Sequence, residues 1–315
     1  MSLHPRLWIA VTAWLLFASL LPASARGEAT PSSNKLQLYV MPDTQSWAWN
    51  QDGTTLATWT AVAKELCRQR HRFVMVLHTG DLVDDPKHPY EWSNALSVMQ
   101  LLDACEMPYA IPFGNHDFDN YPPPKDPLAL HGDQNWTALV AKLAHKPAET
   151  APSGKTALHA LAKGWFVLSL DYRVSAADLA WIAAEIGERR GSKFLLLHHY
   201  CVKASGVSYE WCKQLFEQHP EIRIGVSGHW LGSTRDGWKQ VARANGRKLI
   251  TLFQNYQHVP SLAAWGVVVE LDPGSGDLCV WSENLLTGAV THPAAFSNAV
   301  GEVAAGVGRR CFSGS

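Results

Sequence analysis

The chain has 315 residues, with 27 lysine and arginine side chains against 28 aspartate and glutamate, and a formal net charge of −1 at pH 7. This balance provides no electrostatic basis for binding nucleic acid or an anionic membrane surface, so no nucleic-acid partner is expected. The length allows one large domain with a sizeable buried core.

Residues 1–25 have the pattern of a secretory signal peptide. An apolar run over residues 7–21 is followed by the small residues Ala23 and Ala25. The run is shorter than the roughly 20 residues that span a bilayer, so we expect a cleaved signal and no membrane anchor. We therefore expect a secreted or periplasmic protein whose residues 26–315 form a single domain.

The cysteine count agrees with export. Six cysteines follow the signal sequence, and an even number in an exported chain favours three disulfides, although 15 connectivities are possible. Free buried thiols remain the alternative, and the spacing is not that of a zinc site. The six are Cys67, Cys105, Cys201, Cys212, Cys279 and Cys311.

Strand and helix patterns alternate along the first third of the chain. Residues 35–42 alternate polar and apolar, and residues 73–77 form a short apolar run, so both are predicted to be strands. Residues 54–70 and 91–105 have helical patterns, and a further strand is predicted at 108–113. This order predicts parallel strands joined by helical crossovers.

The pattern weakens over residues 118–163, which we interpret as an insertion over one edge of the domain, with a short helix possible at 136–144. Further strands are predicted at 164–171, 193–199 and 222–228, with helices at 175–189 and 209–219 between them. Three more strand patterns, at 248–253, 264–271 and 278–281, suggest an antiparallel or mixed second sheet.

Polar side chains follow the predicted strands at the point where each ends. In open α/β sheets, ligands bind outside the carboxyl ends of the strands. Carboxylates, amides and imidazoles without thiolates suit divalent Mn, Fe or Zn. The residues at these positions are Asp43 and Gln45, then Asp81 and Asp84 in GDLVDD, then Asn115, His116 and Asp117 in GNHD, then His198 and His199, and finally His229.

The order D-x-Q, GDLVD, GNHD, H, GH resembles the calcineurin-like metallophosphoesterases, whose pattern is D-x-H, GDxxD, GNH[DE], a lone His and GHxH. It is most similar to a bacterial and fungal branch with DTQ at the first motif, which LFQNYQ at 252–257 also resembles. The similarity extends over residues 36–284. It implies an α/β fold: a four-layer αββα sandwich of two mixed β-sheets flanked by helices.

The resemblance implies a site with two divalent metal ions. Asp81 would bridge both ions, and Asp43 and Gln45 would bind the first. Three residues would bind the second: Asn115, His198 and His229.

The resemblance also implies residues that act without binding metal. His116 would lie over the substrate and assist the leaving group, Asp117 would orient its ring, and Asp84 would hold the loop. The implied reaction is hydrolysis of a phosphomonoester or phosphodiester by a metal-activated hydroxide, on a small-molecule or lipid substrate. The alternative is a metal-depleted scaffold that binds a carbohydrate or phosphorylated ligand without turnover.

Two departures from the family pattern affect the same ion. Gln45 stands where the broader family has histidine, and Leu231 replaces the last histidine. An amide oxygen is a weaker donor than imidazole toward zinc, so we expect one tight and one weak site, filled by Mn, Fe or Zn. Asp52 or Glu91 could supply a missing ligand.

Several assignments stay open on the sequence. Family alignment favours His198 over His199 as the ligand, but the pair lies at a strand end, where alternation does not decide. Trp47 and Trp230 follow site motifs and could wall the pocket, although packing beneath the loops is simpler. Asn255 is a candidate for a phosphate or supporting contact. The oligomeric state is not evident.

Overall fold

Two β-sheets form the framework of the computed structural model, which describes residues 35–118, 131–202, 209–229, 236–242, 248–256, 264–291 and 309–313. All of these lie within one unit, Asn34–Ser315. The predicted signal peptide, Trp230, Leu231 and Gln257 lie outside the described residues.

The first sheet has the order β13-β12-β11-β1-β2-β3, with β14 paired to β12. Strands β1, β2 and β3 are parallel, while β11 pairs with β1 in the antiparallel sense. The bounds are β1 Leu36–Met41, β2 Phe73–His78, β3 Tyr109–Ala110, β11 Trp265–Leu271, β12 Leu278–Asn284, β13 Val290–Thr291 and β14 Arg310–Phe312.

The second sheet has the order β4-β5-β6-β7-β8-β10-β9. Its central strands β6, β7, β8 and β10 are parallel, and antiparallel strands border them on both sides. The bounds are β4 Glu149–Thr150, β5 Ala157–Ala160, β6 Trp165–Ser169, β7 Lys193–Leu197, β8 Ile222–Ser227, β9 Asp236–Ala242 and β10 Lys248–Gln254.

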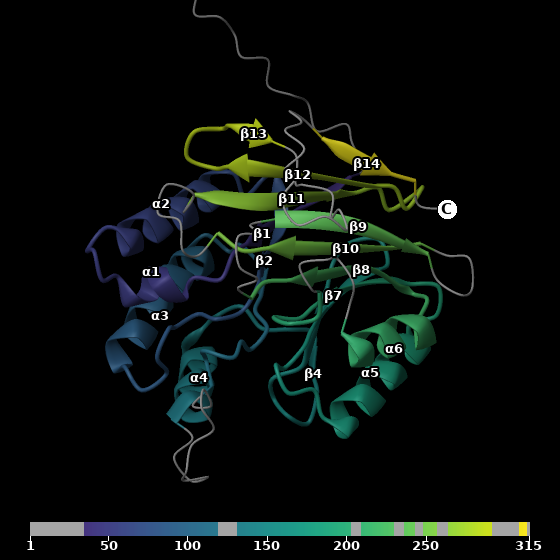
Figure 1. Ribbon diagram of the computed structural model, residues 1–315, viewed down its shortest axis with the longest axis horizontal. Helices are drawn as coiled ribbons and strands as arrows, with labels where there is room; N and C mark the ends of the chain where they lie inside the picture. The colour runs from purple at the N-terminus through teal and green to yellow at the C-terminus, as the bar shows by residue number, and fades with distance from the viewer. Residues whose placement is uncertain are drawn as a thin grey trace, which may run out of the picture. The chain divides into compact units, whose positions relative to one another are not determined.

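Six helices cover the outer faces of the sheets (Figure 1). Helices α1 to α4 share an apolar cluster with the first sheet, and α5 and α6 share another with the second. The bounds are α1 Gln45–Trp49, α2 Thr55–Arg68, α3 Pro89–Ala104, α4 His131–Lys142, α5 Ala176–Glu188 and α6 Glu210–Gln218.

Alternation along the strands produces the layers. On β1, Leu38 and Val40 join the apolar cluster between the two sheets, whereas Tyr39 and Met41 join the cluster beneath α1 to α4. Successive side chains of a strand point to opposite faces, so each buried strand contributes to two cores. The predicted four-layer αββα arrangement of two mixed sheets is confirmed.

All six cysteines are paired, as the even count predicted. The disulfides are Cys67–Cys105, Cys201–Cys212 and Cys279–Cys311. The first joins α2 to the end of α3, the second fixes the segment after β7 to α6, and the third joins β12 to β14. Among the described residues, no helix has both the length and the apolar character that crossing a bilayer requires.

The short and peripheral elements differ from the sequence expectation. The three tail strands do not form a sheet of their own, because β10 lies parallel to β8 while β11 and β12 extend the first sheet. Strand β9 was not predicted and pairs with β10 at the sheet edge. Within 118–163, residues 119–130 are not described, α4 packs on α3, and β4 and β5 extend the second sheet.

Candidate metal centre

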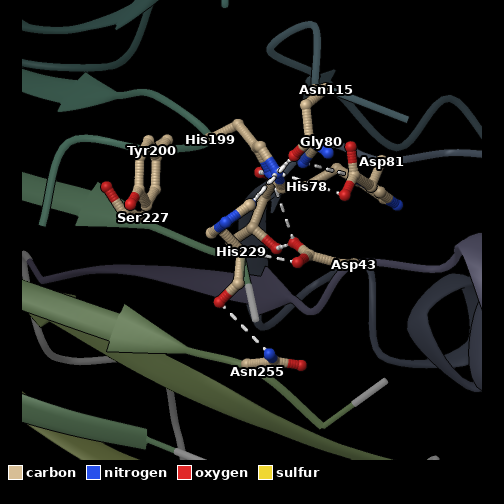
Figure 2. A network of polar contacts seen from close by, with 12 residues as sticks. Asp43, His78, Gly80, Asp81, Asn115, His199, Tyr200, Ser227, His229 and Asn255 are labelled. Carbon is tan, nitrogen blue, oxygen red and sulfur yellow. Dashed lines mark hydrogen bonds and ion pairs between the residues drawn. The ribbon is translucent and has the colours of Figure 1, made fainter. Parts of the chain in front are cut away.

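Five strand ends bring their polar residues to one place. Asp43, Asp81 and Asn115 follow the parallel strands β1, β2 and β3 of the first sheet, and His199 and His229 follow β7 and β8 of the second. Figure 2 shows these five side chains gathered in one network. Parallel strands end at the same edge, and the two edges meet here.

The ring of His199 is at the centre of the network. Its Nε2 lies 2.9 Å from Asn115 Oδ1, 3.1 Å from Asp81 Oδ2 and 3.1 Å from His229 Nδ1. His229 Nδ1 is also 2.9 Å from Asn115 Oδ1, and Asp43 Oδ1 is 3.7 Å from His199 Nδ1. Asp81, His199 and His229 each place one ligand atom within 4.8 Å of the others.

The orientation of the His199 ring fixes its tautomer. Its Nδ1 is 2.9 Å from the Thr79 carbonyl oxygen, which can only accept, so Nδ1 carries a hydrogen and donates it. In the neutral ring, Nε2 then presents its lone pair to the carboxylate and amide oxygens around it. A hydrogen bond of this kind at the far ring nitrogen is the usual support for a metal-bound imidazole.

Burial and charge oppose each other at the two central groups. Burial lowers the pKa of His199, but the carboxylates of Asp81 and Asp43 outweigh it and raise the pKa to about 9. Burial alone would raise the pKa of Asp81, yet the charge and hydrogen bond of His199 hold that pKa below its usual value. Without a metal ion, the two therefore form a buried ion pair.

The outer members of the network lose charge on burial. Burial raises the pKa of Asp43 to about 7, against the opposing effects of His199 and of a 2.5 Å hydrogen bond from Thr79 Oγ1. Burial lowers the pKa of His229 to about 4, and the charge of His199 adds to this effect. A neutral imidazole is the form that binds a cation.

The backbone around the network is tight and locally strained. Asp81 and His229 have φ values of 51° and 71°, in the left-handed region that non-glycine residues occupy at a cost of about 1–2 kcal/mol. A side chain at Gly114 would collide with the Asp81 carboxylate, and one at Gly228 with Asp43. The GNHD and GH motifs therefore require glycine for close approach of two loops.

Asp117 holds the GDLVDD and GNHD loops together. Its Oδ1 accepts from the backbone N–H groups of Leu82 at 2.8 Å and Val83 at 3.2 Å, and its Oδ2 accepts from Gly114 at 2.9 Å. The expectation that Asp117 orients the His116 ring is therefore wrong. A fully buried carboxylate is needed to satisfy three backbone donors that no strand can reach.

Asp84 instead lies against His116. His116 Nδ1 donates to the Asp84 carbonyl oxygen at 2.8 Å, and the Asp84 carboxylate lies 3.4 Å from the same atom. The His116 backbone N–H donates to Asp81 Oδ1 at 2.8 Å. Burial lowers the pKa of His116, but the charge of Asp81 and the contacts with Asp84 raise it overall. The roles expected for Asp84 and Asp117 are thus exchanged.

The structure gives the central position to His199 and not to His198. Leu195 and Leu197 of β7 face the other sheet, whereas Leu196 faces α5 and α6, and His198 continues on that outer side. Its ring lies 4.8 Å from that of Trp211 on α6, and its Nδ1 accepts from the Tyr200 backbone N–H at 2.9 Å. The expected ligand role of His198 is corrected accordingly.

The remaining predicted residues divide between the site and the core. Gln45 is 2 % exposed in the first turn of α1, and within the described residues its Oε1 has no hydrogen-bond partner. Trp47 is 1 % exposed and packs edge-on against Trp59 in the core, so it does not wall the pocket. Asn255 Nδ2 donates to the His229 carbonyl oxygen at 3.1 Å.

Neither replacement ligand lies in the network. Asp52 accepts from the backbone N–H groups of Thr54 and Thr55 at the start of α2. Glu91 accepts from Asp84 N at 2.7 Å and contacts His88 at 2.9 Å. Both carboxylates therefore stabilise local backbone.

Two residues near the site were not predicted. Thr79 contacts both Asp43 and His199, and the ring of Tyr200 lies 4.2 Å from that of His229. Their only sequence signal is position: Thr79 precedes Gly80-Asp81, and Tyr200 follows His199. His78 is a buried core histidine that contacts Thr44 Oγ1 at 2.9 Å.

The chemistry of these side chains fits a divalent metal ion. Two imidazoles, a carboxylate and an amide oxygen converge. In the neutral His199 ring, Nε2 offers a lone pair, as do the Asp81 carboxylate and the Asn115 amide oxygen. A divalent cation could replace the proton that His199 carries in the metal-free ion pair, and this mixture of nitrogen and oxygen suits Mn, Fe or Zn. The partnerless Gln45 Oε1 is a further buried oxygen donor near the first strand end.

Solved structures with this architecture include metallophosphatases. A purple acid phosphatase from yellow lupin (Lupinus luteus) aligns over 82 % of this chain and 53 % of its own, with 14 % identity and a TM-score of 0.54. A dimetal phosphatase from Danio rerio aligns over 81 % of this chain and 98 % of its own, with 13 % identity and a TM-score of 0.56. At these identities the likeness establishes the fold.

Sequence comparison identifies the family. An uncharacterized protein of Bacillus subtilis (strain 168), YvnB, is 23 % identical over 174 residues, which is 51 % of this chain and 13 % of that protein. The profile of the calcineurin-like phosphoesterases matches residues 36–232, more than half of the chain, and includes every member of the network. The chain therefore belongs to the calcineurin-like phosphoesterase family.

Proposed function

We propose that the protein hydrolyses a phosphomonoester or phosphodiester at a two-metal centre. Asp81 would bridge the ions, because it is the carboxylate that lies against both His199 and the His116 backbone. Asn115, His199 and His229 would hold one ion, and the pair Asp43 and Gln45 the other. The bound ions would acidify a water molecule as nucleophile and neutralise charge on the phosphoryl oxygens.

The two ion sites should differ in strength. The site of Asn115, His199 and His229 has two imidazoles and an amide oxygen whose positions are fixed by contacts of 2.9–3.1 Å. Apart from the bridging Asp81, the described residues offer the site of Asp43 one further candidate ligand, Gln45. We therefore propose one tight ion and one weak ion.

His116 would donate a proton to the leaving group. Its Nδ1 is committed to the Asp84 carbonyl oxygen, so Nε2 is the nitrogen left for substrate. Its backbone N–H on Asp81 Oδ1 fixes the ring relative to the metal centre.

The observation that carries this proposal is the convergence of residues from five strand ends around the ring of His199 (Figure 2). The test compares wild type, His116→Ala and the control His71→Ala, an exposed histidine before β2. Substrates are phosphodiesters and phosphomonoesters with p-nitrophenyl or alkyl leaving groups, assayed with Mn²⁺.

We expect His116→Ala to keep its metal content and to lose roughly 10²–10⁴-fold in turnover of alkyl esters. Loss with p-nitrophenyl esters should be much smaller, since that leaving group needs no proton. Equal losses on both classes would contradict the acid role. Absence of turnover in wild type with any ion or ester would contradict the hydrolase itself.

The proposal extends to the substrate, the metal ions and the cellular compartment. We propose a small-molecule or lipid phosphoester as substrate and Mn, Fe or Zn as the ions. Three disulfides favour a secreted or periplasmic location, because such bonds persist in oxidising compartments.

A further inference from the structure

Two tyrosine rings border the metal centre on the side of the second sheet. Tyr200 follows His199 directly, and its ring centroid is 4.2 Å from that of His229, with the planes at 54°. The ring of Tyr209 is 4.2 Å from that of Tyr200, at 47°. Figure 2 shows Tyr200 beside His229. Tyr200 and Tyr209, here called the tyrosine pair, therefore extend the metal centre with aromatic surface.

The tyrosine pair is held in place by its surroundings. The Tyr209 backbone N–H donates to the Cys201 carbonyl oxygen at 3.0 Å, and the Cys201 N–H donates to Ser227 Oγ at 3.0 Å. The disulfide Cys201–Cys212 joins the same segment to α6. A ring fixed in advance loses little conformational entropy when it contacts a ligand.

Among the described residues 198–202 and Tyr209, only the two tyrosines are partly exposed. His198 is 1 % exposed, and Cys201 and Val202 are fully buried, whereas Tyr200 and Tyr209 are half-buried. His229, which Tyr200 contacts, is also half-buried. Of the described residues that follow β7, the one that contacts His229 and is partly exposed is therefore aromatic.

We propose that the tyrosine pair binds the alcohol part of the substrate, and that the enzyme prefers phosphoesters whose alcohol carries a flat unsaturated ring, either aryl or nucleoside. This inference rests on the proposed function of the same centre. A flat ring can stack on or meet the edge of a tyrosine ring, and every aryl group or base has such a face. An alkyl alcohol such as glycerol has none.

The test measures binding by calorimetry with Mn²⁺-loaded protein and three phosphonates that resist hydrolysis. Phenylphosphonate and a nucleoside 5′-phosphonate carry a ring, and methylphosphonate does not. Wild type should bind at least one ring-bearing compound on the order of tenfold tighter than methylphosphonate. Tyr200→Leu should lose this difference without a change in methylphosphonate affinity, and Tyr200→Phe should keep it.

Each outcome decides between the two proposals. Equal affinities in wild type, or a Tyr200→Leu variant that weakens all three compounds alike, would overturn the subsite while hydrolysis stands. Failure of wild type to bind methylphosphonate, together with absent phosphoester turnover, would overturn the proposed function. Tyr209→Leu repeats the test if Tyr200→Leu does not fold. The phenyl and nucleoside arms separate an aryl ester from a nucleotide.

Discussion

The two sheets contribute to the metal centre in different ways. The first sheet supplies Asp43, Asp81 and Asn115 on loops, two of which are joined by the backbone hydrogen bonds of Asp117. The second sheet supplies two imidazoles, and each is oriented by a partner in the first. His199 Nδ1 donates to Thr79 O at 2.9 Å, and His229 N donates to Asp43 Oδ2 at 2.7 Å.

This difference implies that the second-sheet part of the centre depends on the first-sheet part more than the reverse. The first-sheet loops satisfy one another through buried backbone contacts, so their geometry does not need the second sheet. The two histidines depend in part on atoms of the first sheet for their positions, so damage to the first sheet should spread to the second. Damage to the second sheet should remain local.

The largest effect is expected from Asp81→Asn. This change removes the charge that contacts His199 at 3.1 Å and accepts from His116 N at 2.8 Å. Loss of a bridging carboxylate should lower kcat about 10³-fold or more, since metal stabilisation of transition-state charge amounts to several kcal/mol. Metal content by mass spectrometry and kcat are measured together. Asp85→Asn in the same motif is the matched control, and equal losses in both variants would contradict the bridging role.

The adjacent histidines test the second sheet. His199→Ala should lower metal affinity by more than roughly 100-fold, because even residues that support a ligand contribute 10–100-fold. His198→Ala should keep metal affinity and instead lose about 2–4 kcal/mol of unfolding free energy, since a buried ring that contacts Trp211 is removed. Titration with Mn²⁺ and urea unfolding measure the two quantities. The reverse pattern would restore His198 as the ligand.

This pair also marks the limit of sequence reasoning. Strand patterns located the ends of β1, β2, β7 and β8 closely enough to find every motif, because buried parallel strands are continuous apolar runs. At the end of β7, however, the alternation of side chains predicts which face of the sheet a residue lies on only if the last residue with regular strand geometry is known. Leu197 faces the inner core, and this one fact, which the sequence does not contain, places His198 outside and His199 inside.

The roles of Asp84 and Asp117 were exchanged for a related reason. Both are carboxylates in neighbouring motifs, and the family resemblance implied that Asp117 orients His116. The partners of Asp117 are instead backbone groups 34 and 35 positions earlier in the chain. The edge strands β9, β13 and β14 were missed because their sequences lack a continuous apolar run.

Asp117→Ala should damage the fold of the first-sheet loops. Three buried backbone N–H groups would lose their acceptor, which costs about 3 kcal/mol or more in unfolding free energy. Asp84→Ala, whose side chain is a third exposed, should change it by less than about 1 kcal/mol. Urea unfolding with and without Mn²⁺ measures both. Similar stabilities for the two variants would show that Asp117 does not hold the loops.

A further expected effect is a pH dependence of metal binding that the first sheet imposes on the second. The carboxylates of Asp81 and Asp43 raise the pKa of His199 to about 9 against the effect of burial, so the metal-free ring is protonated at neutral pH. A cation must displace this proton. Affinity should therefore fall about tenfold for each pH unit below 9 and be independent of pH above it.

Asp43 should make the dependence of metal affinity on pH steeper below about pH 7. Burial raises the pKa of its carboxyl to about 7, so below that pH a second proton must leave before Asp43 can bind a cation. Titrations with Mn²⁺ between pH 6 and 9, followed by competition with a chelator of known proton affinity, give the slope. In Asp43→Asn, the additional loss of metal affinity below pH 7 should disappear, while the pH dependence due to His199 remains. The pKa of His199 that sets this dependence should be lower, because one neighbouring carboxylate is gone. An affinity that does not change with pH would mean that the imidazole is neutral before the cation arrives, and that the first sheet does not set the charge of the second.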